Sequence, residues 1–276
     1  MNAQTLMSYR DRPHWSYSSL NQLLNLCSLQ WFFEKIERIP KPFTPVAIAF
    51  GGVYHRVMEF IALTRMEQKL PTENDTRDLF HELWKREGED GPPLEKDEEV
   101  TPEEFASQGA ELAVAYLKQI EPEERVVTMN EVFAVPVGDS ERPLVGEIDC
   151  VVERAGDRSI VDWKTSAKRW PKSQADRSLQ PTIYLYAYRQ LHPEKAPQFR
   201  FDVAVKNKTP VIERNMTTRT GDDFQRLECL VHKAEQIVQQ DVFYPSDQSF
   251  MCGGCPFREP CRAWHRRQAR VMSLAA

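Results

Sequence analysis

The chain has 276 residues, 41% hydrophobic and 28% charged, which is typical of a soluble globular protein with one large or two small domains. The N-terminus lacks the apolar stretch of a signal peptide, and no segment is predicted to span a membrane. The net charge is −5, and we expect a cytoplasmic protein whose six cysteines are thiols or metal ligands rather than disulfides.

The N-terminal third is predicted to be helical. Residues 1–15 are polar, and we expect them to be loosely held. Ser16 or Ser18 is expected to cap a helix whose leucines recur at helical spacing and which ends near Cys27. In this apolar setting, Cys27 taken alone would be interpreted as a buried structural thiol.

A second helix is predicted over Ala49–Met66, after a stretch broken by three prolines. His55 lies in its first turns among apolar residues, where a lone histidine more often belongs to the core than to a ligand set. Residues 72–86 and 102–120 also show helical spacing of apolar residues. We expect these helices to form a cap over the rest of the protein.

The most informative stretch is a predicted β-hairpin around the turn Ala155-Gly156, flanked by two runs rich in Val and Ile. Side chains alternate along a strand, so Asp162 and Lys164 share one face. A turn centred on these two residues would place Asp149 directly opposite Asp162. Two close carboxylates repel each other, so a divalent cation and the lysine would be needed between them. Such a group suits phosphodiester hydrolysis, although an Asp-x-Lys pair alone is most often a surface salt bridge.

Strands and helices alternate around this hairpin. A strand is predicted over Glu131–Val137, and a helix after the hairpin places Gln180 and Tyr184 on one face because they are four residues apart. These two side chains could hold a phosphate or a base, or simply pack between helix and sheet. Two strands and a long helix are predicted to follow, over Phe201–Val205, Val211–Met216 and Asp222–Gln240. The pattern indicates an α/β fold with a mixed sheet and flanking helices.

The last segment contains three closely spaced cysteines, Cys252, Cys255 and Cys261, in a loop rich in glycine and proline. Together with a fourth cysteine, such a loop suits either tetrahedral zinc or an iron–sulfur cluster, and the spacing alone does not decide between them. The remaining two cysteines, Cys150 and Cys229, are predicted to be core thiols.

Together and in this order, these motifs resemble the PD-(D/E)xK nuclease superfamily in its RecB-like branch. The similarity extends to the AddB nuclease domain, the CRISPR-associated RecB-like nucleases and exonuclease V, and covers nearly the whole chain. One departure is Ser28, which stands where the family usually has proline. The resemblance is carried by Gly146-Glu-Ile-Asp149, Asp162-Trp-Lys164, Gln180-x-x-x-Tyr184, the segment around His55, and Cys27 with Cys252, Cys255 and Cys261.

The resemblance implies a restriction-endonuclease-like core with an N-terminal helical cap and a C-terminal cysteine cluster loop. It further implies four sets of site residues. Mg²⁺ or Mn²⁺ would be held by His55, Asp149, Asp162 and the backbone carbonyl of Trp163, and the catalytic residues would be Asp149, Asp162 and Lys164. The substrate would be contacted by Gln180 and Tyr184. A [4Fe–4S] cluster, with zinc as the alternative, would be held by Cys27, Cys252, Cys255 and Cys261.

Three regions are expected. Residues 1–125 would form the helical region with Cys27 and His55, and residues 126–245 the nuclease core. Residues 246–276 would carry the iron–sulfur cysteines and a basic tail, packed as one unit with the N-terminus.

The charge distribution is compatible with DNA binding despite the negative total. Residues 87–104 contain nine Asp or Glu and one Lys, and we interpret this segment as a solvated connection away from the DNA. The rest of the chain is net positive. Basic residues cluster beside the motifs at Lys164, Lys168, Arg169, Lys172 and Arg177, and at Arg262, Arg266, Arg267 and Arg270.

The predicted function is a metal-dependent deoxyribonuclease, an exonuclease on single-stranded DNA or duplex ends in repair, recombination or CRISPR-type DNA processing. Two alternatives stay open: a non-catalytic subunit that binds DNA ends, and a trimming subunit whose activity depends on an integrase partner. The 276 residues contain no P-loop, so a helicase activity would come from a partner protein.

Overall fold

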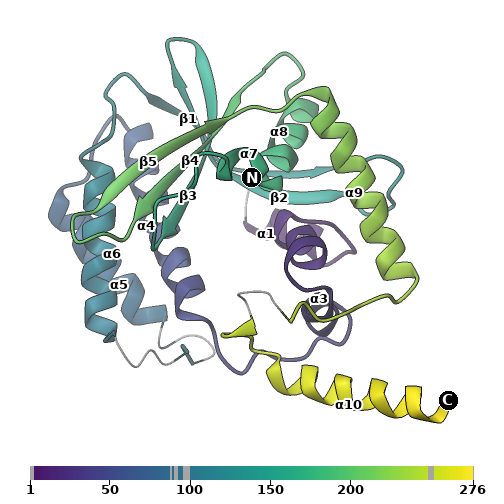
Figure 1. The fold of residues 1–276 in the computed structure, drawn as a ribbon. Helices are drawn as coiled ribbons and strands as arrows, with labels where there is room; N and C mark the ends of the chain where they lie inside the picture. Colours follow the sequence, from purple (N-terminus) through teal and green to yellow (C-terminus); the bar gives the residue numbers. More distant parts are fainter. Residues whose placement is uncertain (1–2, 88, 90–92, 96–99, 248–251, 276) are drawn as a thin grey trace.

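A computed structural model describes residues 3–87, 89, 93–95, 100–247 and 252–275 (Figure 1). Its centre is a mixed sheet in which the five strands follow one another in chain order. Strands β3 and β4 are parallel, whereas the other neighbouring strands are antiparallel. The strands are β1 (Arg125–Val135), β2 (Leu144–Arg154), β3 (Asp157–Ser166), β4 (Gln198–Val205) and β5 (Val211–Thr217). The predicted α/β fold with a mixed sheet and flanking helices is therefore confirmed.

The parallel pair explains the position of two helices. Parallel neighbours cannot be joined by a tight turn, so the chain crosses over between β3 and β4. This crossover contains α7 (Gln174–Arg177) and α8 (Leu179–Leu191), whose N-cap is Ser178. After β5, helix α9 (Gly221–Gln239) packs on α8.

Helices cover both faces of the sheet and make two hydrophobic cores. On one face lie α4 (Val46–Met66), α5 (Glu73–Glu87) and α6 (Pro102–Leu117). The other face is covered by the N-terminal residues, α8 and α9. Because side chains alternate along a strand, Ile160 of β3 belongs to the second core and its neighbour Val161 to the first.

The β2–β3 hairpin has the predicted two-residue turn. Ala155 and Gly156 have φ angles of 52° and 93°, as a type I′ turn requires, and Cys150 pairs with Val161. Continued by one residue, this register places residues 149 and 162 opposite each other. The predicted register of the hairpin is confirmed.

The N-terminal segment is more ordered than predicted. Residues 3–10 form α1 (Ala3–Arg10), and Trp15 is completely buried, with its backbone hydrogen-bonded to Pro143 and Val145. For residues 3–15 the expectation of a loosely held segment is therefore wrong, because a large aromatic side chain anchors them; residues 1 and 2 lie outside the described residues. Ser16 caps α2 (Tyr17–Asn21) as predicted; a π-helical turn (Gln22–Leu26) and α3 (Ser28–Lys35) follow.

Other expectations need correction. Strand β1 begins at Arg125, six residues before the predicted Glu131. Cys150 is buried as predicted, but Cys229 is exposed on α9, so it is not a core thiol. Much of the acidic segment 87–104 lies outside the described residues.

Helix α4 also bears on the question of membranes. Its 21 residues are long and apolar enough to cross a bilayer by length and composition alone, contrary to the sequence-based expectation. Eight of its side chains are nevertheless buried, and they belong to the core between α4 and the sheet. This burial accounts for its composition, and α4 is a core helix.

Candidate active site

Four candidate residues from three elements meet at one edge of the hairpin. His55 of α4 places Nδ1 3.5 Å from Oδ2 of Asp149 on β2. Lys164 places Nζ 2.6 Å from Oδ2 of Asp162 on β3. The ring of His55 lies edge-on to that of Trp163, with centroids 6.0 Å apart, so α4 is held against the strand that carries both Asp162 and Lys164.

The two carboxylates differ in exposure, since the side chain of Asp149 is 24% exposed whereas that of Asp162 is almost fully buried. Asp162 is 2% exposed. Burial raises the pKa of Asp149 well above its usual value, and the charge of Asp162 raises it further. Two such groups are stabilised in their ionised form only by nearby positive charge.

The other two members of the site differ in charge. Burial alone would lower the pKa of Lys164, but the Asp162 and Asp149 carboxylates outweigh it and raise that pKa, so Lys164 is an ammonium group. Burial lowers the pKa of His55, which favours a neutral imidazole at neutral pH, although the Asp162 charge opposes this shift. A neutral imidazole is the form that binds metal ions.

Gln180 and Tyr184 both lie beside this group, as their shared helix face predicts. The Gln180 amide is buried, and its Nε2 donates a hydrogen bond to Oδ1 of Asp162. Tyr184 packs edge-on against the rings of Phe133 and Phe199 at centroid distances of 5.6 and 6.0 Å. Gln180 thus orients a candidate catalytic carboxylate. The substrate-binding role predicted for both residues stays a prediction.

Sequence reasoning missed three residues around the site. Tyr17 of α2 has its pKa raised by burial, an effect opposed by the nearby Lys164 ammonium. Glu59 and Glu147 add negative charge that raises the pKa of Asp149. Glu59 follows His55 by four residues on α4, so helical spacing could have indicated it.

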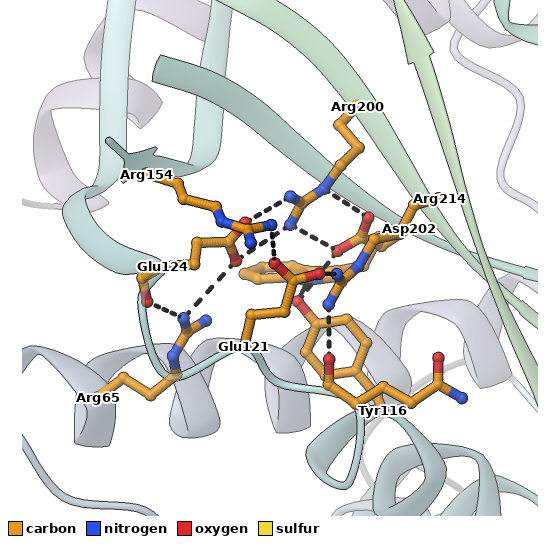
Figure 2. A network of polar contacts seen from close by, with 10 residues as sticks. Arg65, Tyr116, Glu121, Glu124, Arg154, Arg200, Asp202 and Arg214 are labelled. Atoms are coloured by element: carbon orange, nitrogen blue, oxygen red, sulfur yellow. Dashed lines mark hydrogen bonds and ion pairs between the residues drawn. The ribbon is translucent and has the colours of Figure 1, made fainter. Parts of the chain in front are cut away.

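A buried polar network supports β3 from the opposite side of the sheet (Figure 2). The Trp163 indole donates a hydrogen bond to the Tyr116 hydroxyl at 3.0 Å, and this hydroxyl donates to Asp202 Oδ2 at 3.2 Å. Arg200 in turn binds Asp202 at 2.8 Å and also pairs with Glu124. The residue between the two candidate catalytic side chains is therefore anchored by a chain of buried hydrogen bonds.

The donor chemistry of the site fits a divalent cation. Asp162 Oδ2 is buried and makes no regular hydrogen bond, although Lys164 lies 2.6 Å from it. His55 and Asp149 add an imidazole nitrogen and a second carboxylate, which are common metal ligands. Within the described ranges, however, no three His, Cys, Asp or Glu side chains are close enough to one another to hold a metal ion.

The four cysteines predicted to bind iron line one cavity of about 280 Å³. Cys27 precedes α3, Cys252 and Cys255 lie in the segment before α10 (Arg258–Ala275), and Cys261 is in the first turn of α10. All four are free, and burial raises the pKa of Cys255 and Cys261, so these two are thiols rather than thiolates at neutral pH. The cysteines are brought to one place, but no metal-binding group is formed in the part of the chain that the structure describes.

Ser28, the departure from the family pattern, has a structural role at this junction. Its hydroxyl donates to the Tyr244 carbonyl at 3.0 Å and accepts from the Tyr244 amide at 2.9 Å. Leu29 adds a backbone hydrogen bond of 3.1 Å to the same carbonyl. These bonds fix the chain after α9 beside Cys27.

A mixed sheet with a His, two Asp and a Lys together at a hairpin edge provides the groups that phosphodiester hydrolysis needs. Residues 14–262 match the family described as the PD-(D/E)XK nuclease superfamily. The match covers more than half of the chain, which therefore belongs to this superfamily. No curated protein matches the sequence.

One solved structure shows the same fold. The crystal structure of a “putative exonuclease” from Eubacterium rectale has a TM-score of 0.54 and 14% identity, and the match covers 92% of each chain. That of SSO0001 has a TM-score of 0.43 and 10% identity over 94% of this chain and 93% of the other. At 14% identity, the likeness to the Eubacterium rectale protein concerns the fold alone.

Proposed function

We propose that this nuclease is a metal-dependent deoxyribonuclease of the RecB-like branch, an exonuclease that acts on single-stranded DNA or duplex ends. The observation that carries the proposal is the meeting of His55, Asp149, Asp162 and Lys164 at one point, where Asp162 is buried and the other three side chains are partly exposed. A degenerate, purely DNA-binding member would be expected to lack at least one of these groups. The similar Eubacterium rectale protein is described as an exonuclease, which supports the exonuclease assignment.

The residues divide the chemistry among them. Asp149, Asp162, His55 and the Trp163 carbonyl would hold Mg²⁺ or Mn²⁺, which when bound supplies Lewis acidity toward the phosphate and toward a water molecule. Lys164, kept as an ammonium beside Asp162, stabilises the negative charge that develops on the phosphate or positions the attacking water. Gln180 fixes the Asp162 carboxylate, and Trp163 is fixed from behind by Tyr116.

We further propose that Cys27, Cys252, Cys255 and Cys261 bind a [4Fe–4S] cluster, with zinc as the alternative. The four soft donors around one cavity support this proposal. The cluster would link α3 to the C-terminal segment, and its binding would release thiol protons. A cytoplasmic location and a helicase or integrase partner complete the proposal.

The function is tested by digestion of end-labelled single- and double-stranded DNA with Mg²⁺ or Mn²⁺. Wild-type protein should release nucleotides from the ends, and Asp162→Ala should lower the rate by at least ~10²-fold, the scale of lost electrostatic and metal catalysis. Asp157→Ala is the matched control, because Asp157 is an exposed aspartate at the start of the same strand. Equal losses in the two variants would refute the assignment, and internal cleavage of a circular strand would refute the exonuclease mode.

A further inference from the structure

A second concave site lies on the N-terminal side of the molecule. It is a cavity of about 420 Å³ between the end of α1, the end of α3 and the β1–β2 connection. Five cationic side chains line it, against two carboxylates, Asp11 and Glu34. The cationic side chains are Arg10, Arg12, Lys35, Arg38 and Arg142. A cavity with this charge balance attracts anions.

Three of these cations are available to a ligand. Lys35 lies 3.0 Å from Glu34, and Arg142 lies 3.8 Å from Glu235. Within the ranges that the structure describes, Arg10, Arg12 and Arg38 have no ion-pair partner, and all three are exposed. Guanidinium groups are well suited to phosphate oxygens, because their planar donors can bind two oxygens at once.

The wall of the cavity is rigid. Trp15 is fully buried, and the Arg142 guanidinium lies over its ring at 5.2 Å. The Trp15 indole donates a hydrogen bond of 2.8 Å to Glu235 on α9, and its backbone is bonded to the residues that flank Leu144. The lining residue Arg142 is thus packed on a tryptophan that is itself held by α9 and by the start of β2.

Two segments of the chain, α2 and β2, lead from the cavity to the candidate active site. Ser16 and Ser19 line the cavity, while Tyr17, between them in the chain, lies within electrostatic reach of Lys164 and Asp162. The backbone of Trp15 is hydrogen-bonded to the carbonyl of residue 143 and to the amide of residue 145. These residues flank Leu144, the first residue of β2, and Asp149 follows on the same strand. At about 3.3 Å per residue, the five residues from 144 to 149 span roughly 17 Å, the length of a few nucleotides.

We propose that this cavity binds the phosphate backbone of the single DNA strand that lies in the candidate active site, a few nucleotides from the scissile bond. The inference rests on the proposed nuclease function and adds the path of the substrate strand to it. The binding is electrostatic and independent of sequence, because the cavity offers exposed guanidinium groups whereas its tryptophan, Trp31, is buried.

The test is a double variant, Arg12→Gln with Arg38→Asn. Arg38 has a φ of 52°, a conformation that asparagine tolerates, so the exchange removes charge without added backbone strain. Lys208→Gln with Lys233→Gln is the matched control, since it removes two cations of the β4–β5 turn and α9 outside the cavity. Melting temperatures equal to that of the wild type establish that both double variants are folded. If Arg38→Asn prevents folding, the single variant Arg12→Gln is used in place of the double variant.

Binding of a fluorescent oligothymidylate is measured in EDTA at several salt concentrations. The cavity variant should bind at least ~10-fold more weakly and lose about 1.4 units of salt slope, near 0.7 per released phosphate contact. The control should keep the wild-type slope. An unchanged slope in the cavity variant overturns the proposal.

Hydrolysis of a p-nitrophenyl ester of thymidine 5′-phosphate, measured with Mn²⁺, separates the two levels of inference. This substrate is too short to reach the cavity, so the cavity variant should hydrolyse it at the wild-type rate. A wild-type protein that binds the oligothymidylate with the predicted slope but hydrolyses neither substrate would refute the nuclease function and leave the binding site standing. A selective loss of ester hydrolysis in the cavity variant would contradict a role in strand binding.

Discussion

The buried network behind β3 makes a prediction about a single hydroxyl group. Replacing Tyr116 by Phe removes the acceptor of the Trp163 indole N–H and one donor to Asp202. Tyr54→Phe is the matched control, because the Tyr54 hydroxyl is also buried but has no hydrogen-bond partner among the residues that the structure describes. The two exchanges remove the same atom from the same core.

The structure sets the size of the effect. Asp202 keeps its hydrogen bonds of 2.8 and 3.1 Å from Arg200, so the main loss falls on the N–H of Trp163, a buried residue. Leaving a buried donor unsatisfied costs about 1–3 kcal/mol, and we expect Tyr116→Phe to lower the free energy of unfolding by that amount. The melting temperature should fall by about 2–4 °C per kcal/mol. Tyr54→Phe should be neutral or stabilising.

The assay is urea denaturation in EDTA, followed by tryptophan fluorescence and circular dichroism. Because Trp163 lies between Asp162 and Lys164, the nuclease rate of Tyr116→Phe should also fall, whereas Tyr54→Phe should keep it. Equal stabilities of the two variants would refute the reasoning, since the two hydrogen bonds of the Tyr116 hydroxyl would then contribute nothing.

Three further predictions follow from other parts of the structure. Gln180→Leu should lower the rate of DNA hydrolysis by at least ~10-fold, because Asp162 loses the amide that orients it; an unchanged initial rate would exclude this role. Cys261→Ser should abolish the iron content and brown colour of protein purified without air, while Cys229→Ser, outside the cysteine cavity, should not; one zinc per colourless wild-type chain would favour the alternative. Burial lowers the pKa of Lys206 to about 8, so the unfolded chain binds more protons between about pH 8 and 10.4 and the free energy of unfolding should rise with pH there. Lys206→Met should flatten this rise and the exposed Lys208→Met should not, as measured by denaturation at both ends of the window.

The local parts of the fold and site were predictable from sequence. The Val- and Ile-rich runs and the Ala155-Gly156 turn determine the hairpin register, and the register alone puts Asp149, Asp162 and Lys164 together. Helical spacing likewise puts Gln180 and Tyr184 on one face of α8. These inferences need only the geometry of single elements.

What could not be predicted depends on contacts between distant segments. Trp163 and Tyr116 are 47 residues apart, and Arg200 and Glu124 are 76 apart. Charged residues are expected at the surface, so nothing in the sequence indicates that Arg200 and Asp202 are buried as a pair. The position of His55 beside Asp149 was expected from the family resemblance, because no local pattern places α4 across the sheet.

The most direct test of the central claim is the exchange Asp149→Asn, measured for stability and activity in one preparation. Burial and the Asp162 charge disfavour the ionised form of Asp149, so the nearly isosteric amide should leave the melting temperature in EDTA unchanged or raise it. Hydrolysis of end-labelled single-stranded DNA with Mn²⁺ should nevertheless fall by at least ~10²-fold. A stable Asp149→Asn protein that digests DNA at the wild-type rate would contradict the account.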